Sequence, residues 1–102
     1  HDLRPDSPSC GRGLTLWLSA STPTVVAFPR GIVHGWLFPT DAVHLQAVSE
    51  PYAEYGEDDN HGCHYQDPEL GIDWDHPVTS LSARAAAFGP LRALRARMQA
   101  SR

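Results

Sequence analysis

Apolar and polar residues alternate along much of the first two thirds of the chain. Leu14, Leu16 and Leu18 occupy every second position, with Thr15 and Trp17 between them. A period of two is typical of a strand that buries one face. By this alternation, or by short runs of apolar and β-branched residues, the sequence predicts five strands: 14–18, 24–28, 35–38, 42–49 and 63–66.

Residues that favour turns separate these segments. Proline in residues 29–31 presets one dihedral angle of a tight turn, and the following glycine accepts a positive φ. We expect further turns over 2–8 and 19–23, and a turn or a single helical turn over 67–71. Residues 51–59 are acidic and aromatic, which favours a surface loop.

Helix is predicted mainly near the C-terminus, in two segments rich in residues of high helix propensity: 83–87 and 91–100. The pair Gly89-Pro90 separates them, because proline breaks a helix, and residues 80–82 could cap the first. Apolar residues at positions i, i+3 and i+7 predict a stripe that docks the second helix. They are Leu91, Leu94 and Met98.

Five predicted strands followed by helix indicate an all-β domain of antiparallel strands, arranged as a sandwich or barrel with a C-terminal helix. The length of 102 residues fits one small domain over residues 1–102, with a helical segment over 81–100. Five strands cannot close a useful barrel by themselves, and open sheet edges attract other chains. The predicted sheet therefore needs a missing part or a partner.

Charge is divided unevenly along the chain. Residues 1–75 carry twelve acids and three arginines, whereas residues 76–102 carry five arginines and no acid, and the total is −4. An acidic body argues against general nucleic-acid binding, which needs a basic face. No apolar run approaches the roughly 20 residues that span a bilayer, so neither nucleic acid nor a membrane is an expected partner.

Two cysteines, Cys10 and Cys63, are too few for a disulfide framework or a zinc site. Residues 61–64, His-Gly-Cys-His, contain ligand types that zinc prefers, but no second cluster completes four ligands, and we expect no metal or other cofactor. The chain begins with His1 and no apolar signal segment follows. We interpret it as a fragment or processed product with reduced thiols, located in the cytoplasm.

Four short motifs occur in a recognisable order. Residues 2–8 read Asp-Leu-Arg-Pro-Asp-Ser-Pro, and residues 29–36 read Pro-Arg-Gly-Ile-Val-His-Gly-Trp. Residues 66–74 read Gln-Asp-Pro-Glu-Leu-Gly-Ile-Asp-Trp, and residues 81–84 read Leu-Ser-Ala-Arg. In content and order they resemble motifs in the second half of the dTDP-4-dehydrorhamnose 3,5-epimerase family. Four motifs in register make a far more specific signal than any one of them.

The resemblance implies a cupin fold, a double-stranded jelly-roll barrel, here a partial barrel that lacks its N-terminal half. It also implies a homodimer, a nucleotide-sugar ligand, and epimerisation of a dTDP-4-keto-6-deoxyhexose through proton abstraction at C3 and C5. The family's preceding stretch carries the histidine that acts as base and a lysine that polarises the keto oxygen. Those motifs are not among these residues, and we assign no catalytic residue.

Two positions depart from the family pattern. Counted back from Tyr52, the position of the family's catalytic tyrosine holds Gln46, and an amide cannot act as a phenolic acid. The position of the aspartate that orients the base holds Ala85, whose methyl group cannot orient an imidazole. We therefore predict that the isolated chain has no epimerase activity. The alternative function is a non-catalytic cupin module that binds a nucleotide sugar or another carbohydrate.

The resemblance gives four candidate substrate-binding residues, and three of them have an ordinary structural alternative. His34 would contact the hexose, or it is a strand-end histidine bonded to backbone. Gln46 would bond a sugar hydroxyl or keto group, or it is one polar residue of a mixed strand. Tyr52 would stack on a base or sugar, or it covers the barrel rim. Arg84 would pair with the diphosphate, whereas the later arginines are a solvated helix end.

Strand alternation predicts which neighbours share the face of His34. Side chains two residues apart point to the same side of an extended chain, so Trp36 shares a face with His34. Along the next predicted strand, His44 shares a face with Gln46. We expect this face to point inward and His44 to join the wall of the ligand pocket.

Overall fold

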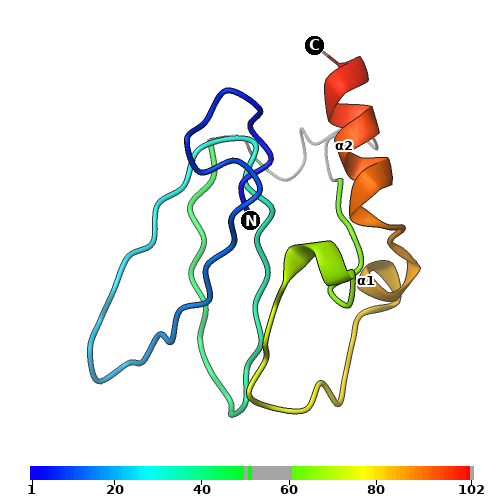
Figure 1. The fold of residues 1–102 in the computed structure, drawn as a ribbon. Coiled ribbons are helices and arrows are strands. Elements are labelled where there is room, and N and C mark those ends of the chain that lie inside the picture. The colour runs from blue at the N-terminus through cyan, green and yellow to red at the C-terminus, as the bar shows by residue number, and fades with distance from the viewer. Residues whose placement is uncertain (50, 52–60, 102) are drawn as a thin grey trace.

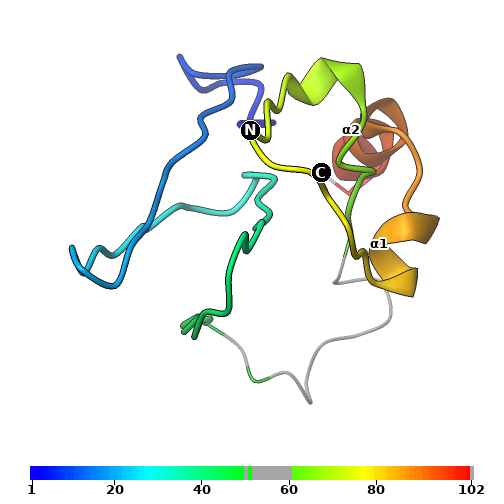
Figure 2. The ribbon, with the colours of Figure 1, turned by 90° about the horizontal axis from the view of Figure 1, so that it is seen from below.

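The chain divides into extended hairpins and a helical region (Figure 1). The computed structural model describes residues 1–49, 51 and 61–101. We call residues 12–32 the first hairpin and residues 33–49 the second hairpin. In the described part, the helices are a 3₁₀-helix and two α-helices: η2 (Pro68–Leu70), α1 (Ala83–Ala87) and α2 (Leu91–Ala100). Figure 2 shows the hairpins on one side of the molecule and both α-helices on the other.

The two α-helices have the bounds that the sequence predicts. The Ser82 hydroxyl accepts a hydrogen bond from the backbone N–H of Ala85, which caps α1. Phe88 has extended backbone angles and ends this helix, and α2 begins after Pro90. The predicted turn near residue 67 is confirmed as well, because η2 forms there and ends at Gly71.

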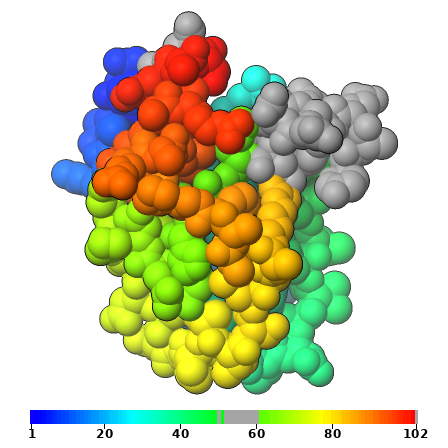
Figure 3. All heavy atoms as spheres, turned by 90° about the vertical axis from the view of Figure 1, so that its right-hand side faces the viewer, coloured from blue at the N-terminus to red at the C-terminus, as the bar shows by residue number. Residues whose placement is uncertain are grey.

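The apolar stripe of α2 is confirmed as the centre of a small core. Leu91 is fully buried, and Leu94 packs with it against Leu3 and Leu70. Four partly buried residues pack on this cluster: Val33, Cys63, Ile72 and Met98. Seen from the helical side, α2 and residues 61–80 form one packed surface (Figure 3). The core therefore joins the beginning of the chain to its last helix.

The prediction of an all-β jelly roll with five antiparallel strands is wrong for the described residues. Their backbone pairing consists of two isolated antiparallel bridges, Asp2–Ile32 and Ser19–Thr22, and no sheet or barrel forms. The alternation in residues 14–48 does specify an apolar face, but a strand also needs a hydrogen-bonded neighbour and a covering layer. Neither is present, since Val25 and Val43 each keep 92% of their surface exposed.

The accessible surface area of the whole chain is large, in agreement with hairpins that lack a covering layer. Its accessible area is 8374 Å², whereas a compact monomer of 11.2 kDa should expose about 5,700 Å². Its radius of gyration is 14.5 Å, against about 13 Å for a compact domain of this length. The hairpins contribute to this excess, because most of their large apolar side chains face solvent. No helix in the described residues is long and apolar enough to cross a membrane.

Candidate functional site

A hydrogen-bonded network at the N-terminus fixes the turn that precedes His34. The Asp2 carboxylate, only 5% exposed, accepts bonds from Arg4 Nε and Nη2 at 3.0 and 2.8 Å. It also accepts bonds from the hydroxyls of Ser7 at 2.7 Å and Ser9 at 2.6 Å. These donors, with Arg4 the largest cause, hold the pKa of Asp2 far below its usual range. Charge-assisted bonds of this kind are among the stronger ones in proteins, so the loop is well anchored.

The anchored loop supports Gly31 directly. The backbone N–H of Leu3 donates to the carbonyl oxygen of Gly31 at 2.9 Å. Gly31 has a φ of +89°, and a Cβ atom there would lie 2.6 Å from Cγ of Arg4. Only glycine suits such a backbone angle in such a close contact. The predicted turn at residues 29–31 is therefore confirmed, and it directs the following residues along a fixed path.

Five rings, one before this turn and four after it, form a continuous line, which we call the ring stripe. Ring centroids are 4.5 Å apart for Phe28 and His34, and 5.6 Å apart for His34 and Trp36. They are 4.3 Å apart for Trp36 and His44, and 6.0 Å for His44 and Phe38. Such separations are usual for interacting aromatic rings. All five residues are exposed, so the stripe presents two imidazoles and an indole to solvent.

His34 has a backbone contact in addition to its ring contacts. Its Nδ1 atom lies 3.4 Å from the carbonyl oxygen of Ile32. Because a carbonyl oxygen only accepts hydrogen bonds, this contact favours the tautomer with its proton on Nδ1. Nε2 then has a lone pair that can accept a bond from a hydroxyl group. His34 can therefore bond to the backbone through Nδ1 and still offer Nε2 to a ligand.

The other predicted site residues lie apart from the ring contacts. Gln46 is exposed in the second hairpin, two residues beyond His44. Arg84 lies on α1, and its guanidinium stands 5.3 Å from the centre of the Phe88 ring. Figure 2 shows α1 on the helical side, away from the hairpins. Tyr52 lies outside the described residues. The structure therefore brings His34 together with Trp36 and His44, and it places Arg84 elsewhere.

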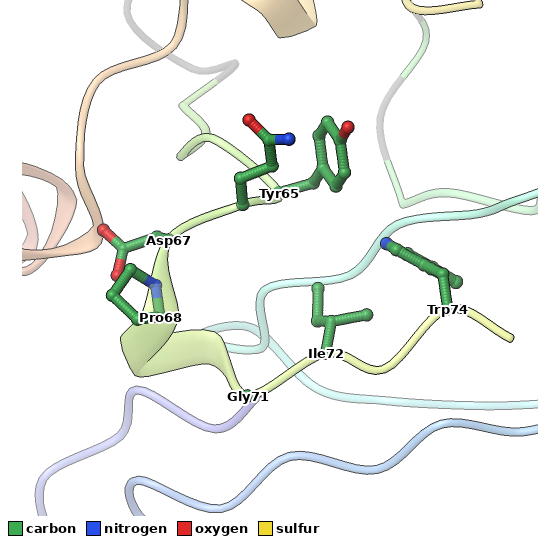
Figure 4. Close-up of a pocket in the computed structure, with 7 residues that line it drawn as sticks. Tyr65, Asp67, Pro68, Gly71, Ile72 and Trp74 are labelled. Atoms are coloured by element: carbon green, nitrogen blue, oxygen red, sulfur yellow. The ribbon is translucent and has the colours of Figure 1, made fainter. Parts of the chain in front are cut away.

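An open cavity of about 620 Å³ lies over the third sequence motif (Figure 4). Its size falls within the range of about 300–1,000 Å³ that is usual for small-molecule sites. The lining residues are Tyr65, Gln66, Asp67, Pro68, Gly71, Ile72 and Trp74. Of the predicted binding residues that the structure describes, His34, Gln46 and Arg84, none is among them. The sequence analysis missed this cavity, although two aromatic residues on either side of a Pro–Gly turn were a usable signal.

The Asp67 side chain links the segment that lines the cavity to α2. No side chain within α2 caps its N-terminus, and the Asp67 carboxylate accepts instead from the backbone N–H of Leu91 at 2.7 Å. The other carboxylate oxygen accepts from the N–H of Glu69 at 2.9 Å, within η2. These two bonds, the one from Leu91 first, lower the pKa of Asp67. An ion pair between Arg95 and Glu69 joins the same two elements.

The chain contains two cysteines and six histidines, side-chain types that bind metal ions. Within the described residues, no group of three or more His, Cys, Asp or Glu side chains could hold a metal ion. Both cysteines are free; Cys10 is exposed and Cys63 is half-buried. Burial raises the pKa of the Cys63 thiol, which disfavours the reactive thiolate.

Comparisons with known proteins identify the family. A family model described as dTDP-4-dehydrorhamnose 3,5-epimerase matches residues 1–93. The dTDP-4-dehydrorhamnose 3,5-epimerase of Escherichia coli (strain K12) is 33% identical over 79 residues, which cover 78% of this chain and 40% of that protein. The protein of the same name from Sinorhizobium fredii (strain NBRC 101917 / NGR234) is 29% identical over 79 residues, covering 76% and 39%.

The chain thus spans about two fifths of the length of these relatives. No solved structure matches it significantly. The matched region contains all four motifs, including the turn at residues 29–31 and the cavity segment at 66–74. On this evidence the chain belongs to the dTDP-4-dehydrorhamnose 3,5-epimerase family.

Proposed function

We propose that this chain is the ligand-binding portion of a dTDP-sugar epimerase-like protein of deoxysugar biosynthesis. Its ligand would be a dTDP-4-keto-6-deoxyhexose. One observation carries the proposal: the family signature at residues 29–36 begins with a turn held by the Asp2 network and presents His34 beside Trp36. A histidine with an available ring edge, next to an exposed indole face, suits a hydroxylated ring.

The reaction of the family defines what a complete site must supply. A base removes a proton next to the C4 ketone, negative charge collects on the keto oxygen, and a proton returns to the other face. In our proposal, Nε2 of His34 accepts from a hexose hydroxyl and the amide of Gln46 donates to a hydroxyl or the keto oxygen. Tyr52 would stack on the nucleotide and Arg84 would pair with the diphosphate.

These residues hold and orient a ligand but do not complete the reaction. An amide at Gln46 is not a proton donor of adjustable pKa. Ala85 contributes its backbone N–H to the cap of α1, and its methyl side chain has no hydrogen-bonding group. The isolated chain is therefore expected to be inactive. The same two residues favour the second candidate function, a module that binds the nucleotide sugar without turning it over.

The proposal includes a homodimer in the cytoplasm. Large apolar side chains that face solvent in both hairpins support association, since such surface is usually covered by a partner. Two free cysteines fit a reducing compartment. Analytical ultracentrifugation of the full-length protein tests the assembly. A single monomeric species across the accessible concentration range would contradict it.

Solvent exchange tests the proposed chemistry. In deuterium oxide, the 102-residue chain should introduce no deuterium at C3 or C5 of dTDP-4-keto-6-deoxyglucose above a control without protein. Exchange above that control would refute the claim that the chain lacks a complete catalytic set. If the full-length protein neither binds nor exchanges this ligand, the assignment to dTDP-4-keto sugars fails.

Replacement of His34 tests the proposed binding residue. His34→Ala in the full-length protein should weaken binding of the dTDP sugar by more than tenfold, a change of roughly 1.4 kcal/mol, with little change in melting temperature. His61→Ala is a matched control, because His61 is also exposed but lies outside the ring stripe. Calorimetric titration measures both affinities. An unchanged affinity in His34→Ala would leave this histidine a structural residue only.

A further inference from the structure

We propose that His44 is a further ligand-contacting residue and that Trp36, between His34 and His44, is the platform on which the ligand's pyranose ring stacks. The inference rests on the proposed function and deepens it, because it names the part of the nucleotide sugar that meets the ring stripe. It adds His44 to the site and gives Trp36 a defined role, and these two residues come from opposite arms of the second hairpin.

The first support is the arrangement of the three rings. The Trp36 ring is tilted by 58° to the His34 ring and by 52° to the His44 ring. Tilted neighbours at 5.6 and 4.3 Å leave part of the indole uncovered, and Trp36 keeps 41% of its surface exposed. The indole is thus flanked by imidazoles and still open to a ligand.

The second support is the difference between the two sides of the second hairpin. Residues two apart share a side of an extended backbone, so His44 has Gln46 on its side, while Val43 and Leu45 fall on the other. Val43 and Leu45 are aliphatic and almost fully exposed. Among residues 43–46, the two polar side chains therefore fall on the side that carries the rings, and the two side chains on the other side are aliphatic.

The chemistry of the stripe favours a sugar ring as the ligand part. The C–H groups on one face of a pyranose pack on an indole face, while its hydroxyls project outward within reach of flanking donors and acceptors. Imidazole nitrogens beside Trp36 can fill both roles. The five members of the stripe include no arginine and no lysine, the side chains best suited to pair with a diphosphate. A sugar ring therefore suits the side chains of the ring stripe better than the diphosphate does.

The test compares two probes on the full-length protein, dTDP-glucose and dTDP, by calorimetric titration. His44→Ala should weaken dTDP-glucose binding at least fivefold and leave dTDP binding unchanged. Trp36→Ala should weaken dTDP-glucose binding more than tenfold, and Trp36→Phe, which keeps an aromatic face, should lose less. Val43→Ala is the matched control, since it alters the neighbouring residue on the other side of the hairpin, and it should change neither affinity.

Each alternative result has a definite meaning. Equal weakening of both probes in His44→Ala would show that the stripe meets the nucleotide, which overturns the inference. Unchanged dTDP-glucose binding in both His44→Ala and Trp36→Ala also overturns it, while the proposed function stands. Failure of the wild-type protein to bind either probe removes the proposed function, and the inference falls with it. If His44→Ala does not fold, His44→Asn replaces it, and the same weakening specific to dTDP-glucose is expected.

Discussion

Leu91 and Val25 are apolar residues in two regions of one chain, and their surroundings are opposite. Leu91 on α2 is fully buried, whereas Val25 in the first hairpin keeps nearly all of its surface in solvent. The helical region closes its own backbone hydrogen bonds within α2 and η2, and Asp67 supplies the bond that α2 lacks at its start. The hairpin region cannot satisfy its backbone hydrogen bonds within one segment, because an extended backbone bonds only to a neighbouring strand.

The packed core lies in the helical region, whereas the proposed ligand-binding residues His34 and Gln46 lie in the hairpins. Burial of apolar side chains, at roughly 1.5–3 kcal/mol each, stabilises the core around Leu91, Leu94 and Leu70. The ring stripe and the family signature lie instead on hairpins with little burial. They receive their order from the Asp2 network and the Gly31 turn at one end. A site built this way depends on its anchor more than on its own packing.

The largest expected effect comes from the core of the helical region. Leu91→Ala should destabilise the chain by about 2–5 kcal/mol, through lost burial and the cavity left behind. In the monomeric chain, Leu45→Ala, on the exposed side of the second hairpin, should stay within about 0.5 kcal/mol of wild type. Urea unfolding followed by circular dichroism measures both. Equal effects of the two substitutions would erase the distinction between the regions.

A second prediction concerns the anchor of the hairpins. Gly31→Ala places a Cβ atom against Arg4 at a positive φ, and should cost about 1–3 kcal/mol. Gly35→Ala is the matched control, because nothing lies within 4 Å of its Cβ position. Thermal unfolding compares the two variants. If Gly31→Ala is no less stable than Gly35→Ala, the turn is not the anchor described above.

Acid should weaken the anchored parts first. The pKa values of Asp2 and Asp67 lie below their usual range, near 3.9 in an unfolded chain. The stability that these carboxylates contribute is therefore present above about pH 4 and is lost as the pH falls. The melting temperature should drop between pH 5 and pH 3. Asp2→Asn and Asp67→Asn should each flatten this dependence of melting temperature on pH. Asp41→Asn, at an exposed position, is the control and should keep the wild-type dependence. The same dependence in all three variants would contradict the role given to Asp2 and Asp67.

The sequence predicted local features well and long-range ones poorly. Residues 83–87 and 91–100 became helices as expected, because helix propensity, the Ser82 cap and the Gly89-Pro90 break all act within a few residues. The turn at Gly31 is equally local. The five strands failed because alternation says which face is apolar and not what pairs with it. The dependence of α2 on Asp67, 24 residues away, has no local pattern that would reveal it.

The candidate site divides in the same way. Alternation correctly placed Trp36 beside His34, and the ring contacts agree. The expectation that this face points inward is wrong, because His34, Trp36 and His44 are all exposed. Arg84 was suggested by a motif position alone, and its ring contact is with Phe88 on the helical side of the molecule. The cavity over residues 65–74 depends on a bend at η2 that brings separated aromatic residues around one space. Motif order cannot show which segments face each other across that bend.

The central claim is that the ligand meets this chain at the ring stripe of the hairpins and not at the cavity beside the helices. The three tryptophans of the chain lie in different places, and each gives one indole N–H signal in a nitrogen-15 correlation spectrum. The signals are assigned with Trp17→Phe, Trp36→Phe and Trp74→Phe, and dTDP-glucose is titrated into the full-length protein. We predict a saturable shift of the Trp36 signal with the Trp74 signal unmoved. A shift of Trp74 while Trp36 stays in place would contradict the account and move the site to the cavity.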